Sequence, residues 1–70
     1  MMLEKVEEYY KSELTTLKYI PDKEAKWSAV QRCLRVAQYA QILDPKIDYQ
    51  KLETLFEHYK EKIMEDKTEN

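Results

Sequence analysis

The stretch WSAVQRCLRVAQYAQIL, residues 27 to 43, lies at the centre of this sequence and decides how the rest of the chain can fold. In an α-helix each residue turns the chain by about 100°, so apolar residues recurring at steps of three and four gather on one side. Here they cover a wide arc, formed by Ala29, Val30, Cys33, Leu34, Val36, Ala37, Ala40 and Leu43. An arc of that width can contact two neighbours at once, so the stretch predicts a central helix packed between two others.

The segments on either side each show the periodicity of one amphipathic helix. The first places its apolar residues at steps of three and four, at Leu3, Val6, Tyr10, Leu14 and Leu17. The last repeats the pattern with Tyr49, Leu52, Leu55, Phe56, Tyr59 and Ile63. Pro21 and Pro45 separate the three segments, and proline breaks the interior of a helix. We expect helices at roughly residues 3–19, 22–43 and 47–65, followed by a frayed C-terminal tail.

Short connections make consecutive helices antiparallel neighbours. We therefore predict an all-α fold, a three-helix up-down-up bundle with breaks near Pro21 and Pro45, forming one domain over residues 1–70. Trp27 begins the central helix, where we expect its ring to cap one end of the core. The chain contains no glycine, which disfavours tight hairpins and phosphate-binding loops. A helix-turn-helix arrangement of the last two helices is compatible with the same periodicity.

Length, charge and cysteine content narrow the class of protein. A chain of 70 residues has a small core, and its aromatic side chains exceed what three short helices can bury, so we expect self-association as a homodimer. The formal net charge of -2 lacks the basic excess typical of nucleic-acid binding. A single cysteine and the absence of a secretion signal predict a cytoplasmic protein. The longest uncharged run, residues 36–43, is shorter than the roughly 20 residues of a membrane span, so we expect no membrane partner.

The side of the central helix opposite its apolar arc is the candidate binding surface. Arginine and tyrosine are enriched at interface hot spots, because a planar guanidinium and a rigid ring bind much area at small entropic cost. No acidic residue lies between Glu24 and Asp44, which favours a partner protein with an acidic surface, or the acidic face of a second copy. The predicted partner-binding residues are Gln31, Arg32, Arg35, Tyr39 and Ile42.

Packing within the molecule offers a second interpretation of the same residues. In it, Arg32 and Arg35 pair with glutamates of the first helix, and Tyr39 covers an edge of the core. The two interpretations make different demands on the structure, because a binding surface leaves these side chains accessible.

Residues able to carry chemistry are sparse. His58 is the sole histidine, and Cys33 falls on the apolar arc of the central helix. A zinc site needs several converging ligands, and a general base needs both a partner and a pocket. We therefore expect no catalytic residue, no metal site and no cofactor.

These observations predict a non-catalytic protein-interaction module. It would act as a regulator, inhibitor or adaptor of a partner protein, of the kind found among phage- or plasmid-type accessory proteins. The alternative is a small nucleic-acid-binding regulator related to the helix-turn-helix type, in which Gln31, Arg32, Arg35 and Gln38 contact phosphates and base edges.

Overall fold

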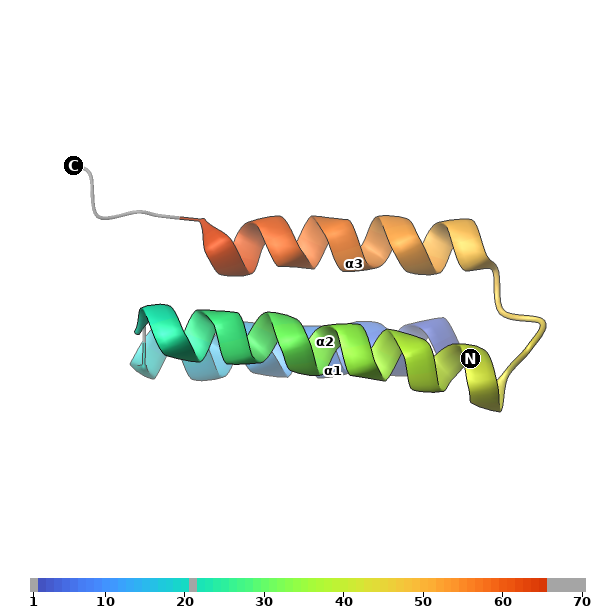
Figure 1. Cartoon of the computed structure of the whole chain (residues 1–70), viewed down its shortest axis with the longest axis horizontal. Coiled ribbons are helices and arrows are strands. Elements are labelled where there is room, and N and C mark those ends of the chain that lie inside the picture. Colours follow the sequence, from blue (N-terminus) through green and yellow to red (C-terminus); the bar gives the residue numbers. More distant parts are fainter. Residues whose placement is uncertain (1, 21, 66–70) are drawn as a thin grey trace.

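A computed structural model describes residues 2–20 and 22–65, and its regular structure consists of three α-helices with no strand (Figure 1). They are α1 (Met2–Tyr19), α2 (Lys23–Leu43) and α3 (Tyr49–Met64). The all-α prediction is confirmed. Figure 1 shows α2 running opposite to α1 and α3, and each helix contacts the other two. Within the described residues, no helix combines the length with the apolar character that crossing a bilayer requires.

The two chain reversals are short. The first separates Tyr19 from Lys23, and Pro21 within it lies outside the described residues. The second contains Pro45 and ends at Asp48, whose side-chain Oδ1 accepts the Lys51 N–H at 3.2 Å. This capping bond satisfies a backbone donor that the first turn of α3 leaves without an intrahelical partner. The tail predicted to fray falls on residues 66–70, which are also outside the described residues.

The core is built from small side chains of α2 and larger side chains of α1 and α3. Tyr10 and Tyr59 meet here, with ring centroids 5.5 Å apart, and the Tyr10 hydroxyl donates to the Cys33 carbonyl at 3.3 Å. The buried residues of α2 are Ala29, Val30, Cys33, Ala37 and Ala40. Those of the neighbouring helices include Val6, Tyr10, Leu17, Leu52, Tyr59 and Ile63. Because the α2 side chains are short, the rings of Tyr10 and Tyr59 have room between the helices.

Several large side chains expected in the core or against one end of it lie at the surface instead. They are Trp27, Leu34, Leu43 and Tyr49. Two neighbours cover less of the circumference of α2 than its apolar arc occupies, which leaves Leu34 and Leu43 exposed. Tyr49 is the first residue of α3 and Trp27 follows the first turn of α2, so both lie toward the ends of the bundle, where fewer neighbouring side chains can cover them.

Two leucine substitutions test this division between core and surface. Leu52 is 1% exposed, so Leu52→Ala should lower the free energy of unfolding by about 2–5 kcal/mol by leaving a cavity. Leu43 is 72% exposed, so the same change there should cost less than about 0.5 kcal/mol. Urea titration followed by circular dichroism measures both values. Equal losses for the two variants would contradict the assignment.

Candidate protein-interaction site

The five predicted partner-binding residues all lie on the solvent-exposed side of α2. Tyr39 is 63% exposed and Ile42 is 71% exposed. Because the set extends from Gln31 to Ile42, it occupies successive turns of one helix face. We refer to Gln31, Arg32, Arg35, Tyr39 and Ile42 as the α2 outer face.

Arg32 lies at the edge of this face and is bound to α1. Its Nε and Nη2 atoms donate to the two carboxylate oxygens of Glu13, at 2.7 and 2.8 Å. The Tyr9 hydroxyl donates to Glu13 Oε2 at 2.6 Å. Such a two-point pairing of a guanidinium with a carboxylate is both strong and directional. It is the contact that the packing interpretation expects of Arg32.

The electrostatics of Glu13 follow from these contacts. The carboxylate belongs to a residue that is 7% exposed, and burial alone would raise its pKa. The hydrogen bonds from Arg32 outweigh burial and, with the bond from Tyr9, lower the pKa of Glu13 below its ordinary value. Burial and donation to Glu13 raise the pKa of Tyr9, and pairing with Glu13 raises the pKa of Arg32. The cluster is therefore fixed as an ion pair with a neutral phenol.

Sequence reasoning missed Tyr9 and Glu13 as members of this cluster. Their spacing of four residues puts both on one side of α1, and Glu13 lies beside the apolar face formed by Tyr10 and Leu17. A carboxylate beside a buried face needs a donor from a neighbouring helix. The need of Glu13 for such a donor is the feature of the sequence that could have predicted this cluster.

The other members of the α2 outer face make no comparable contact. Within the described residues, Arg35 forms no ion pair and no hydrogen bond through its side chain, and neither does the Tyr39 hydroxyl. The packing interpretation therefore accounts for Arg32 but not for Arg35 or Tyr39.

Large apolar side chains surround the α2 outer face and extend it. Most of the exposed large apolar residues in the described part of the chain belong to α2: Trp27, Leu34, Tyr39, Ile42 and Leu43. Exposed apolar groups gathered on one element commonly mark an interaction surface.

A groove between α2 and α3 lies next to this surface. It encloses about 320 Å³, and its floor includes the buried side chains of Ala37 and Leu52. Its α3 wall carries two exposed carboxylates, Glu53 and Glu57. The remaining lining residues are Leu34, Gln38, Gln41, Tyr49 and Phe56.

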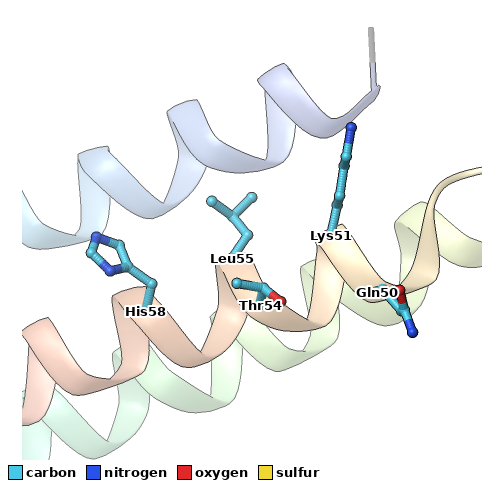
Figure 2. A pocket seen from close by; sticks show the side chains of 5 residues that line it. All are labelled: Gln50, Lys51, Thr54, Leu55 and His58. Carbon is cyan, nitrogen blue, oxygen red and sulfur yellow. The ribbon is translucent and has the colours of Figure 1, made fainter.

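A second, more open groove lies on the side of α3 that faces α1 (Figure 2). Its lining residues are Gln50, Lys51, Thr54, Leu55 and His58, and Figure 2 shows Lys51, Leu55 and His58 directed toward α1.

Across the described residues, no three His, Cys, Asp or Glu side chains are grouped as the ligands of a metal ion are. Burial raises the pKa of the Cys33 thiol to about 12, so this thiol is protonated at neutral pH.

The pairing of Arg32 with Glu13 predicts a specific loss of stability. Arg32→Met leaves a buried carboxylate without its charged donor, which should lower the free energy of unfolding by about 1–3 kcal/mol near neutral pH. Arg35→Met is the matched control, because Arg35 has no ion pair among the described residues, and in dilute, monomeric protein its cost should stay below about 0.5 kcal/mol.

Acid should remove this difference between Arg32→Met and the wild type. The pKa of Glu13 is lowered in the folded state, so its contribution is complete above the ordinary value of 4.5 and is lost as the pH falls through the lowered value. Urea titrations of both proteins at a series of pH values measure the gap in the free energy of unfolding. A gap that stays constant or widens on acidification would contradict the assigned role of Glu13.

No protein-family model, curated protein or solved structure matches this chain. Two surfaces of the chain therefore form the candidate site, the α2 outer face and the groove beside it. Both involve α2, the helix whose exposed side is richest in large apolar residues.

Proposed function

We propose that this chain is a small, non-catalytic protein-interaction module of the cytoplasm, which binds a partner protein through the α2 outer face. Through that contact it regulates, inhibits or connects its partner, as phage- or plasmid-type accessory proteins do. One observation carries the proposal. The helix α2 buries three alanines, a cysteine and one valine, yet it exposes Trp27, Leu34, Tyr39, Ile42 and Leu43.

This distribution is the reverse of what a helix facing water needs. Burying a large apolar side chain gains about 1.5–3 kcal/mol, whereas burying an alanine gains much less. A helix with two neighbours and water on its third side would gain most by placing its large residues inward. The large residues of α2 gain that energy when a partner covers its outer side, as the hot spots of interfaces do.

Charge indicates the chemistry of the partner surface. Arg35 is exposed and has no ion-pair partner in the described residues, and α2 contains no acidic residue after Glu24. A carboxylate on the partner would satisfy the guanidinium of Arg35. The engagement of Arg32 by Glu13 leaves fewer free cations for phosphate contacts, which supports a protein partner over nucleic acid.

Affinity capture with point variants tests the proposal. Tagged wild type is expected to retain a partner from an extract of the organism that carries the sequence, and mass spectrometry identifies it. Arg35→Glu and Tyr39→Ala should each lose that partner, because one introduces a like charge and the other removes a rigid anchor. We expect affinity to fall by at least about tenfold in each variant.

Two control substitutions make the same chemical changes elsewhere. Lys51→Glu reverses an exposed positive charge on the side of α3 that faces α1, and Tyr19→Ala removes an exposed ring at the end of α1. Both controls should keep the partner. Unchanged binding by Arg35→Glu and Tyr39→Ala would overturn the proposal.

The salt dependence of binding separates a protein partner from nucleic acid. A complex formed through the apolar residues of α2 and one free arginine should weaken by less than about tenfold between about 50 and 200 mM salt. A protein that neutralises many phosphates loses roughly a thousandfold or more over the same range. Titration of the captured complex at several salt concentrations gives the slope, and a steep slope would favour the nucleic-acid alternative.

A further inference from the structure

The groove between α2 and α3 complements the α2 outer face of the same molecule in polarity and charge. The groove has an apolar floor, and the exposed carboxylates of Glu53 and Glu57 on its wall form no ion pair with any described residue. The α2 outer face presents apolar side chains together with Arg35, whose guanidinium also lacks a partner. Each surface supplies what the other lacks.

These surfaces share a helix, so one contact between two copies can use both. Leu34 of α2 lines the groove, and the adjacent residue Arg35 lies on the outer face. Along the groove, Leu34 and Gln38 line the α2 wall and Glu53 and Glu57 line the α3 wall. An interface with twofold symmetry requires such a self-complementary patch, because each contact in it occurs twice.

We propose that a second copy of this chain occupies the groove. Two copies pair with their α2 helices parallel, about a twofold axis that runs along the bundle between them, so that α2 of each copy lies between α2 and α3 of the other. Arg35 of each copy then pairs with Glu57 of the other copy. The inference depends on the proposed function, because it names an occupant of the α2 outer face.

The size of the molecule supports this arrangement. A standard interface buries about 800 Å² on each partner. That area is about one seventh of the 5488 Å² accessible surface of the chain. Exposed Trp27, Leu34 and Ile42 supply apolar area on the side of α2 involved, and their burial adds to a core that is small in the monomer.

Charge reversal tests whether residues 35 and 57 pair across the interface, because an interface held by apolar packing alone would not respond to the sign of these charges. Arg35→Glu places two acidic pairs across the proposed interface, and Glu57→Lys places two basic pairs there. Each variant alone should dimerise at least about a hundredfold more weakly than the wild type. An equimolar mixture of the two should form heterodimers, because both pairs are then attractive. Sedimentation equilibrium up to about 100 µM measures the association constants.

Matched controls and the single-chain combination complete the experiment. Glu61→Lys reverses an exposed charge one turn beyond Glu57 and should leave the association constant of the wild type unchanged. The double variant Arg35→Glu with Glu57→Lys should dimerise again. Circular dichroism should show every variant to be as helical as the wild type, since all three positions are exposed.

Two results would overturn the inference: a wild type that stays monomeric at about 100 µM, or dimers that are indifferent to the charge of residues 35 and 57. The proposed function fails separately. A monomeric wild type whose partner is still lost on Tyr39→Ala keeps the proposed function and ends the self-pairing. If the Arg35→Glu and Glu57→Lys variants form heterodimers but Tyr39→Ala loses no partner, the self-pairing stands and the proposed function is wrong.

Discussion

The fold depends on the short side chains that α2 contributes to the core. Ala29, Cys33, Ala37 and Ala40 follow one another along the buried side of this helix. Because they occupy little space, Tyr10 of α1 and the aromatic ring of α3 that contacts it fit within a bundle of three short helices. Apart from Val30, the larger apolar residues of α2 lie mostly where α1 and α3 do not cover the helix, and they form the exposed surface from which the binding function is inferred.

The two arginines of α2 show how finely position determines role. Arg32 and Arg35 lie three residues apart, which turns the second about 300° from the first, or 60° in the shorter direction. Arg32 consequently reaches Glu13 on α1, whereas Arg35 has no acidic partner among the described residues. One arginine stabilises the bundle, and the other remains available for a carboxylate outside it.

Sequence periodicity predicted the three helices to within about two residues at each end, because apolar spacing and proline act locally along the chain. It also assigned all five residues of the α2 outer face to an exposed side. Periodicity failed for Leu34 and Leu43, since their exposure depends on how many helices surround α2. It also failed to distinguish Arg32 from Arg35. That distinction depends on the register between α1 and α2, which fixes where Glu13 lies.

The carboxylates of α1 have a consequence for the handedness of the bundle. Glu13 accepts hydrogen bonds from Arg32 of α2, and Glu7 accepts the Tyr59 hydroxyl of α3 at 3.0 Å. Three antiparallel helices can close with the third on either side of the first two, and apolar spacing along each helix does not by itself specify which. In the mirror arrangement the edge of α1 that carries Glu13 would turn toward α3, whose cations are lysines and which offers no guanidinium for a two-point pairing. Glu13 would lose its two hydrogen bonds from Arg32 there, so this polar contact favours the observed hand of the bundle.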